Sequence, residues 1–456
     1  MRIHPYKLIF SGVFIYVIII GVFIQLYFLP NFPQFHYGHG LLKGGDWEHF
    51  HDTALLCSKL IVGFNYSECE NLFQWQNVIL IPSFAYHFSG VNEPWVILPL
   101  NALLFSISST ALVGIYGFFS NIRTAMIASL PFILYPSAAM IYGQIHKDVI
   151  SICGVFLSIY IYMYLIVKKK NLNFLIVIKL FLLAIIANML IVVVRPYLLQ
   201  VLTFSFFAGL SIYILIKRKF SIYLFPIFFL ILLQVLFIRL NTVDSGNNNG
   251  TKLINSELQN TQVQSSVLPN TQVQSSVLPN TQVPSGAIHV SEHSIIDRVV
   301  RKLGSTREAF ANGYPSAKSN IDLDIKFESM YDVIAYLPRA MQIGLFAPFP
   351  NQWFSESKSE VGGVMRIISS LEMIVGYLLF IGLLLNFGMN AYANQINLII
   401  AYFIPLTLIV IAALVVCNVG TMYRMRYGSW QLLNGFGLMG WVYWIEWKFN
   451  CGLFKS

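Results

Sequence analysis

The chain has 456 residues, of which 56% are hydrophobic and 11% charged, and its mean hydropathy is +0.66. This composition excludes an ordinary soluble domain and is typical of a membrane protein. A net charge of +9 is also found in nucleic-acid-binding proteins, but here the cations stand in short clusters between apolar runs. Membrane topology explains such clusters by itself. We therefore expect the lipid bilayer as a partner, and no nucleic acid.

Apolar runs of about 20 residues, the length at which a helix crosses a bilayer, recur along the chain. They predict an all-α polytopic membrane protein with about ten transmembrane helices. The first run is too long for a signal-peptide core and has no small-residue cleavage site, so we expect an uncleaved first span. The expected spans cover residues 8–29, 95–119, 125–142, 149–167, 174–194, 198–216, 222–240, 367–387, 396–417 and 430–447.

Three regions follow from this pattern. Residues 1–240 form an N-terminal transmembrane module whose first outer loop, residues 30–93, contains interfacial helices at 52–63 and 77–88. An extracytoplasmic loop at 241–365 separates spans seven and eight, and residues 366–456 form a C-terminal transmembrane module. Inside the large loop, residues 261–270 recur identically as 271–280. The low-complexity repeat 261–284 has too little apolar surface to pack, so we expect a flexible insertion without chemistry.

The charge distribution predicts the orientation of the chain. With ten crossings and a cytoplasmic N-terminus, the cytoplasmic side carries many cations against the single acid Glu446. The first outer loop carries two lysines and six acids. We therefore expect a multi-pass protein of the cytoplasmic (inner) membrane with both termini in the cytoplasm. The cytoplasmic cations are Arg2, Lys7, Arg123, Lys168, Lys169, Lys170, Lys217, Arg218, Lys219, Lys448 and Lys455.

The five cysteines show no spacing typical of a zinc or redox site. Cys57 and Cys69 lie in the same outer loop, where they either pair or stay free, and the sequence leaves both possibilities open. His49 and His51 are interpreted as interfacial polar residues, because no further metal ligand stands at a telling distance in sequence. No cofactor is expected, and dependence on a divalent metal stays open.

Several polar residues that are distant in sequence fall at the outer level of the membrane. Charges at membrane depth are costly and usually face a cavity or a partner. Each also has a structural interpretation: a local ion pair for Lys147 and Asp148, contact with lipid phosphates for Arg195, and a solvated acid for Asp46. Glu372, near the start of span eight, is either buried and functional or close to the surface. The converging residues are Asp46 after span one, His146, Lys147 and Asp148 between spans three and four, Arg195 after span five, and Arg424 and Arg426 after span nine.

This combination suits transfer of a sugar from a phosphate-linked lipid. A carboxylate can accept the proton of an attacking hydroxyl, while fixed Lys and Arg side chains neutralise a phosphate leaving group. Arg424 and Arg426 depart from the positive-inside rule, which favours a functional role for them. We expect Asp46 as the catalytic residue, with His51 and Arg339 as secondary candidates. Substrate and phosphate binding is expected from His146, Lys147, Asp148, Arg195, Arg424 and Arg426.

Four short motifs carry a family resemblance: Gly45-Asp46 with Phe50-His51 and Ala54, the interfacial residues 77–90, Tyr135-Pro136-Ser137 followed by His146-Lys147-Asp148, and the run GTMYRMR at 420–426. In these the chain resembles the GT-C class of polytopic glycosyltransferases, particularly the bacterial dolichyl-phosphate-mannose transferase-like and lipid A aminoarabinose transferase-like branch. The similarity lies mainly in residues 1–240.

The resemblance implies a polyprenyl-phosphate sugar donor, a glycan or lipid-linked acceptor, Asp46 as catalytic base, and Lys147 with Arg424 or Arg426 as phosphate-binding residues. Two departures stand out. No second acid adjoins Asp46, which puts metal dependence in doubt, and the large outer segment lies between spans seven and eight rather than at the C-terminus.

Two alternatives remain. An O-antigen or capsule repeat-unit polymerase or ligase also has ten or more spans and a large outer loop with essential arginines, and Arg339 would then be the candidate residue. A non-enzymatic flippase or transporter of lipid-linked sugars would place charged residues inside the spans, where Glu372 is the main candidate.

Overall fold

The computed structural model describes residues 4–62, 68–69, 77–168, 172–218, 224–246, 294–313, 315, 317–354, 360–389 and 392–450. The repeat at 261–284 lies outside the described residues. In the described part the regular elements are helices, apart from one short antiparallel ribbon, β1 (His36–Gly38) with β2 (Leu41–Leu42), and an isolated bridge between Asn320 and Asn418. The predicted all-α class is confirmed.

The N-terminal module begins with α1 (Pro5–Val22), which continues through a π-helical turn, η1 (Phe23–Phe28), into α2 (Leu29–Asn31). Both interfacial helices predicted in the first outer loop are present as helices, although the first starts earlier, at Asp46. After the ribbon come α3 (Asp46–Val62), η2 (Asn77–Ile79), α5 (Leu80–Ser89), η3 (Pro94–Ile97), α6 (Leu98–Tyr116), α7 (Ile122–Ala128), α8 (Leu130–Leu134), α9 (Pro136–Tyr142), α10 (Lys147–Val167), α11 (Phe174–Val194), α12 (Pro196–Lys217) and α13 (Phe225–Gly246).

The second half of the chain contains two amphipathic helices and then a further group of apolar ones. Ser329 starts the second amphipathic helix with a capping box, in which its side chain and that of Asp332 exchange hydrogen bonds with each other's backbone nitrogens. The elements are α15 (Ile295–Gly313), α16 (Met330–Phe346), η6 (Pro350–Gln352), α17 (Glu360–Met389), α18 (Tyr392–Val415), α19 (Val419–Met425) and α20 (Tyr427–Asn450).

Seven of the described helices are long and apolar enough to cross a membrane: 5–31, 94–116, 147–167, 174–194, 196–217, 360–389 and 395–415. The third predicted span is broken instead of straight. Its two parts, 122–134 and 136–142, meet at 70°, because Pro136 cannot continue the hydrogen-bond ladder and Tyr135 is extended. The seventh predicted span corresponds to a shorter apolar stretch at 225–240, and the tenth to α20. The count of ten spans therefore stays a prediction.

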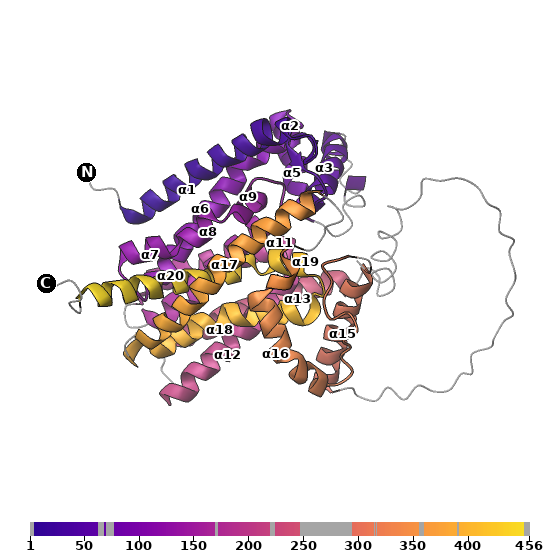
Figure 1. Ribbon diagram of the computed structural model, residues 1–456. Coiled ribbons are helices and arrows are strands. Elements are labelled where there is room, and N and C mark those ends of the chain that lie inside the picture. The colour runs from indigo at the N-terminus through magenta and orange to yellow at the C-terminus, as the bar shows by residue number, and fades with distance from the viewer. Residues whose placement is uncertain are drawn as a thin grey trace, which may run out of the picture.

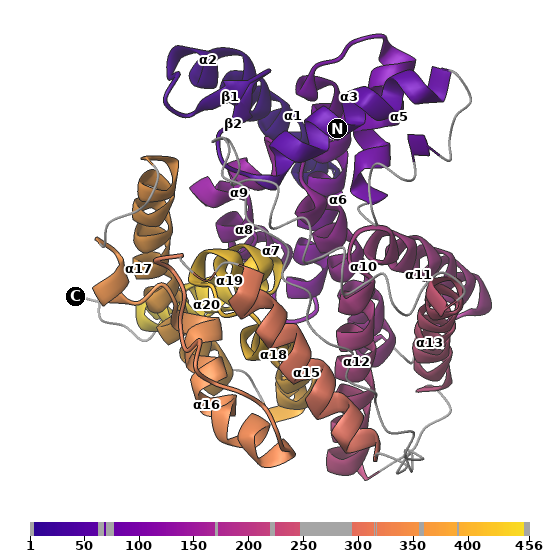
Figure 2. The same ribbon diagram turned by 90° about the vertical axis from the view of Figure 1, so that its right-hand side faces the viewer.

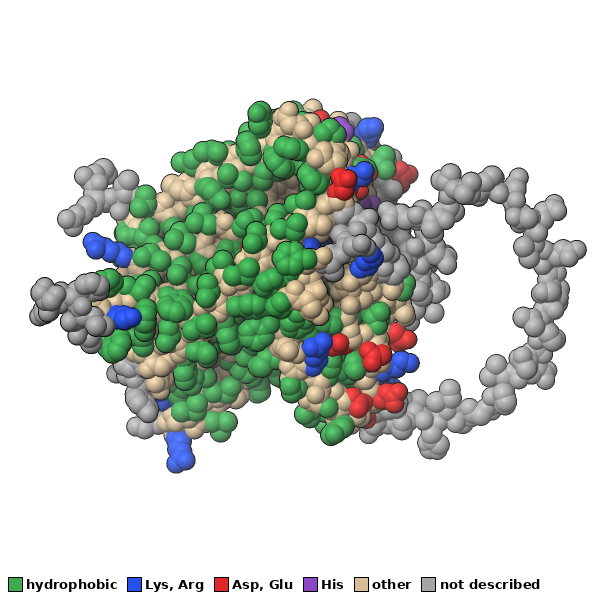
Figure 3. Space-filling model, viewed as in Figure 1, with side chains coloured by type: hydrophobic (Ala, Val, Ile, Leu, Met, Phe, Trp, Pro, Cys, Tyr) green, Lys and Arg blue, Asp and Glu red, His purple; other side chains and the backbone are tan. Residues whose placement is uncertain are grey.

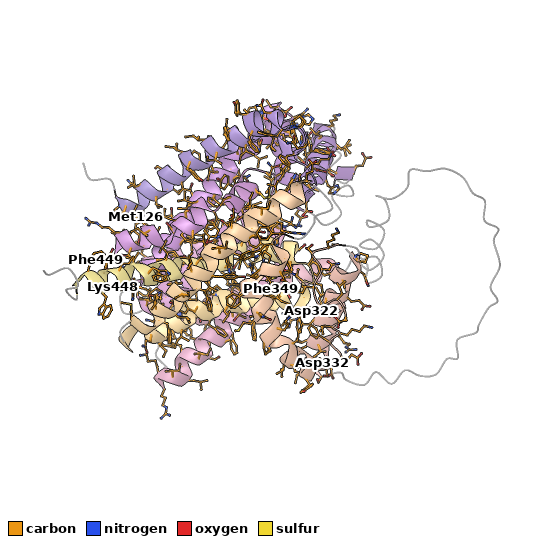
Figure 4. The ribbon with its side chains drawn as sticks, in the orientation of Figure 1. Met126, Asp322, Asp332, Phe349, Lys448 and Phe449 are labelled. Carbon is orange, nitrogen blue, oxygen red and sulfur yellow. A yellow bond between two sulfur atoms is a disulfide. The ribbon has the colours of Figure 1, made fainter. Side chains whose placement is uncertain are left out.

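The long helices run side by side in one bundle, with α1 beginning and α20 ending at the same end (Figure 1). The opposite end, which we call the distal end, carries α3, α5, α15 and α16; Figure 2 views it directly, with α19 near its centre. Hydrophobic side chains cover the flank between the two ends (Figure 3). Figure 4 labels Met126 and Lys448 near the chain termini and Asp322 and Asp332 at the distal end. This distribution fits association with a lipid bilayer.

Helix α20 packs against α17 through glycines. A Cβ atom on Gly440 would overlap the carbonyl oxygen of Gly382, and one on Gly437 would overlap that of Leu379. Helices in lipid gain no hydrophobic driving force from association, so small residues that let backbones approach closely supply van der Waals contact instead. These glycines therefore fix the last helix against the rest of the bundle.

We predict that Gly440→Ala destabilises the protein by about 1–3 kcal/mol, because the added methyl group must push two backbones apart. The control is Gly12→Ala in α1, where a Cβ atom meets nothing within 4 Å. Replacing glycine by alanine raises helix propensity equally in both variants. The difference between their stabilities therefore measures the packing effect. Thermal unfolding of the purified protein in detergent measures it. Equal stability of the two variants would contradict the close contact.

Candidate functional site

The N-terminus of α10 is built around His146 and Asp148, which are 4% and 3% exposed. His146 caps the helix, since its Nδ1 accepts a hydrogen bond of 3.1 Å from the backbone nitrogen of Asp148. Burial lowers the pKa of His146 to about 4, and Arg424 and Arg195 add to the effect while Asp148 opposes it. The same Nδ1 also lies 3.1 Å from Oδ2 of Asp148.

Arg195 lies between α11 and α12 and is 4% exposed. Its Nη2 donates to Oδ1 of Asp148, and its Nη1 donates to the Tyr197 hydroxyl at 3.1 Å. The side chain thus points into the protein and pairs with a carboxylate, so it does not reach out to lipid phosphates as the alternative interpretation required. A buried charge needs such a partner, because desolvation would otherwise make it very costly.

Arg424, on α19, joins this pair to the first outer loop. Its Nη2 lies 3.1 Å from Oδ2 of Asp46, a residue 378 positions away, and its Nε lies 3.9 Å from Oδ2 of Asp148. That Nε has no hydrogen-bond partner among the described residues. Asp46 and Arg424 are partly accessible, with side chains 39% and 32% exposed. One arginine therefore connects an accessible carboxylate with a buried one.

Helix α3 lies against the start of α10. The Lys147 ammonium stands over the Phe50 ring, 5.7 Å from its centre, and the Trp47 and His146 rings lie 5.9 Å apart. Six of the residues predicted to bind substrate or catalyse are thus brought together in what we call the ion-pair cluster: Asp46, His146, Lys147, Asp148, Arg195 and Arg424.

Two cavities adjoin the cluster. The main cavity, of about 350 Å³, is lined by residues that include Trp47, His146 and Arg424. A smaller one of about 80 Å³ is lined by Asp148, Arg195, Arg424 and Arg426 at its polar part and by apolar side chains of α10, α12 and α18 elsewhere. Arg424 lines both cavities and therefore lies between them.

Arg426 has a different setting from the one predicted. Its guanidinium is buried and donates to the carbonyl oxygens of Ile343, Gly344 and Ala347, at the C-terminal end of α16. Helix C-termini leave carbonyls without partners inside the helix, and a cation there also interacts favourably with the helix dipole. The structure thus gives Arg426 a role in holding α16 against the junction of α19 and α20. It also lines a small cavity beside Arg424, and its predicted binding of phosphate stays a prediction.

The two secondary candidates lie outside the cluster. His51 is buried and its Nδ1 lies 2.9 Å from the Tyr86 hydroxyl, between α3 and α5. Arg339 on α16 pairs with Asp322 through Nε at 2.9 Å and Nη2 at 3.2 Å. Although partial burial of Asp322 raises its pKa, the hydrogen bonds from Arg339 and Tyr336 outweigh that effect and lower it overall. Neither His51 nor Arg339 lines the two cavities.

The sequence left open whether Glu372 is buried and functional or close to the surface. It is 4% exposed and accepts hydrogen bonds of 2.7 Å from both the backbone nitrogen and the hydroxyl of Ser137, and a third from the Tyr423 hydroxyl. It therefore ties α17 to α9 and α19, next to the main cavity that Ser137 and Tyr423 line. The signal in the sequence was the isolated acid in an apolar run, but nothing in the chain indicated its partners.

Cys57 and Cys69 form a disulfide, which settles the question left open by the sequence. In the described part of the chain no group of three or more His, Cys, Asp or Glu residues is placed to hold a metal ion. Metal dependence stays open.

No family model, no curated protein and no solved structure matches this chain. The resemblance to GT-C glycosyltransferases therefore stays a prediction.

We predict that Arg195→Met destabilises the protein by about 3–5 kcal/mol, because it leaves Asp148 buried without its main partner. The double variant Asp148→Leu/Arg195→Met removes both charges and should recover most of that loss. Thermal unfolding in detergent measures both, with Arg123→Met at an exposed position as control. A double variant less stable than the single one would show that the pair is not coupled as described.

Proposed function

We propose that the chain is a membrane glycosyltransferase, which moves a sugar from a polyprenyl-phosphate-linked donor to a glycan or lipid-linked acceptor at the outer face of the cytoplasmic membrane. The observation that carries this proposal is the pair between Asp46 and Arg424 at the edge of the main cavity. A carboxylate and a cation at one accessible point are the two groups that such a transfer needs.

In the proposed reaction the acceptor hydroxyl attacks the anomeric carbon of the donor sugar. A new bond forms between that carbon and the acceptor oxygen while the bond to the phosphate oxygen breaks. The proton passes from the hydroxyl to the Asp46 carboxylate, and the lipid phosphate leaves with the electron pair. Arg424 stabilises the charge that develops on the leaving phosphate, and Lys147 adds to the positive potential from the start of α10.

The choice of Asp46 over Asp148 rests on exposure. Asp148 is buried and held by Arg195, and it lines the smaller cavity rather than the main one. Asp46 is 39% exposed, and its neighbour Trp47 lines the main cavity. A general base must come within hydrogen-bond reach of the proton that it removes. In our proposal Asp46 is therefore catalytic, while Asp148 positions Arg195 and Arg424.

Two features support an outer-face location for the distal end. The disulfide of Cys57 lies in α3, and disulfides persist in oxidising compartments outside the cytoplasm. Lys217 and Lys448 end helices on the other side of the bundle, as the positive-inside rule expects of a cytoplasmic face (Figure 1).

We predict that Asp46→Asn lowers sugar transfer by about 10²–10⁴-fold, the usual contribution of a general base. The control is Asp52→Asn in the same helix, whose carboxylate accepts a hydrogen bond from Tyr37 away from the cavity. Each variant is expressed in a strain that lacks the protein, and its surface glycan and lipid-linked precursors are measured by mass spectrometry, with membrane levels of folded protein checked in parallel.

Undiminished transfer by Asp46→Asn would remove Asp46 as the base. The strain that lacks the protein also distinguishes the alternatives. A glycan without one sugar supports the proposed transferase, single repeat units on the carrier indicate a polymerase, and lipid-linked substrate retained on the cytoplasmic side indicates a flippase.

A further inference from the structure

Helix α16 starts at the distal end and ends among the membrane-crossing helices, beside α18 (Figure 1). The Phe346 ring lies 5.0 Å from the ring of Phe380, which is well inside candidate span 360–389. A Cβ atom on Gly344 would lie 2.7 Å from the Ile409 side chain, six residues before the distal end of candidate span 395–415. Six helical residues correspond to about 9 Å. The C-terminal end of α16 therefore lies level with the apolar parts of two spans.

Charged residues of this segment are confined to its first part. Asp332 belongs to the capping box that starts α16, and Arg339 pairs with Asp322. From Ala340 to Phe354 the sequence contains no charged residue. Charged side chains are costly in hydrocarbon, so an uncharged run suits membrane depth and Arg339 suits the boundary with water.

The carbonyl groups at the end of α16 have no partners within the helix, as at every helix C-terminus. Water would satisfy them at an exposed helix end, but here side chains from α17, α20 and the residue before α20 do so. Each carbonyl from residue 343 to residue 347 has such a donor, which is what a helix that ends in hydrocarbon requires. The hydrogen bonds run from Arg426 to Ile343, Gly344 and Ala347, from Trp430 to Leu345 at 3.1 Å, and from Tyr377 to Phe346 at 2.9 Å.

The turn that follows α16 also suits a place inside the membrane. Pro348 and Pro350 have no N–H group that needs an acceptor. The backbone nitrogen of Phe349 donates to the Gln352 side chain at 3.0 Å, and the Trp353 indole donates to the carbonyl oxygen of Pro348 at 2.8 Å. Irregular backbone at membrane depth is tolerated where it is buried in protein or lines a cavity, and Pro348 and Gln352 line the main cavity.

One side of α16 is apolar and exposed. Its residues recur every three or four positions, so they lie on one face of the helix. This face, which we call the α16 stripe, consists of Tyr331, Ile334, Leu337 and Met341, and their exposed fractions lie between 37% and 77%. Because the helix descends to the level of the apolar spans, the medium that meets the deeper part of the stripe is hydrocarbon.

We infer that α16 and the turn after it form a re-entrant segment, which enters the membrane at the distal end, turns near Ala347 and returns to the same side. Its partner is the acyl chains of the distal leaflet, which contact the α16 stripe. The inference does not rest on the proposed reaction, and it differs from the wholly extracytoplasmic loop that the sequence predicts for 241–365. It places Pro348 and Gln352, and with them part of the wall of the main cavity, below the membrane surface.

The test locates spin labels on α16 in the full-length protein reconstituted into phospholipid vesicles. Labels are attached to Ile334→Cys, Leu337→Cys or Met341→Cys, each combined with Cys451→Ser. Electron paramagnetic resonance then measures how often each label collides with dissolved oxygen and with an anionic chromium chelate. Oxygen concentrates in hydrocarbon, whereas the chelate stays in water because transfer of a charge into an apolar medium is very costly. The chain with Cys451→Ser alone controls for labelling of the other cysteines.

We expect the ratio of oxygen to chelate collisions to rise from Ile334 to Met341. At Met341 it should be at least about tenfold higher than at Glu328→Cys, an exposed position just before α16, because hydrocarbon excludes the charged chelate. The matched control for contact with lipid is Ile374→Cys, which is 43% exposed on candidate span 360–389, and its ratio should be similar to that at Met341.

A ratio at Met341 as low as that at Glu328 would place α16 in water, and one intermediate ratio at all three positions would place it flat on the membrane surface. Either result would overturn the re-entrant segment. Protection of the three labels from both reagents would show that protein, such as a second copy of the chain, covers the α16 stripe, and would overturn its contact with lipid. The outcome for Asp46→Asn is independent of all three results.

Discussion

The buried pair of Asp148 and Arg195 is the interaction on which the distal end depends. It links the start of α10 to the junction of α11 and α12, and α10 is the most buried of the candidate spans, with 89% of its apolar window inside the protein. In a membrane no water is available to solvate an unpaired charge, so either residue without the other would be very costly. The pair therefore fixes three helices at the level where Arg424 and Asp46 meet.

Arginines at the distal end have two different roles: some bind backbone carbonyls, and others line a cavity. The number of charges does not distinguish these roles. Arg426 and Arg307 are buried and donate to backbone carbonyls, Arg426 at the end of α16 and Arg307 to Asp322, Ile325 and Leu414. Both join outer elements to the bundle. Arg424 keeps contact with a cavity on each side. Of two cations only two residues apart on the chain, Arg426 therefore binds backbone carbonyls, whereas Arg424 pairs with a carboxylate at the edge of the main cavity.

The sequence was sufficient to predict the helical class, most span positions and the meeting of Asp46, Asp148, Arg195 and Arg424, because hydropathy and charge place residues at a depth in the membrane. The sequence was not sufficient to predict in which direction each side chain points at that depth in the membrane. Arg426 turned toward α16, and Arg339 toward Asp322. Periodicity also missed the 70° bend at Pro136, although the proline itself was a visible signal.

The bend and Glu372 together explain how an opening can exist beside the ion-pair cluster. A straight third span would carry α9 along the bundle, but the turn at Pro136 directs it away, so Ser137 comes to line the main cavity. Turning the chain leaves backbone donors at the start of α9 without helical partners, and Glu372 accepts one of them. The same carboxylate holds Tyr423 next to Arg424. Glu372 thus satisfies the broken helix and sets the position of the cation that lines the main cavity.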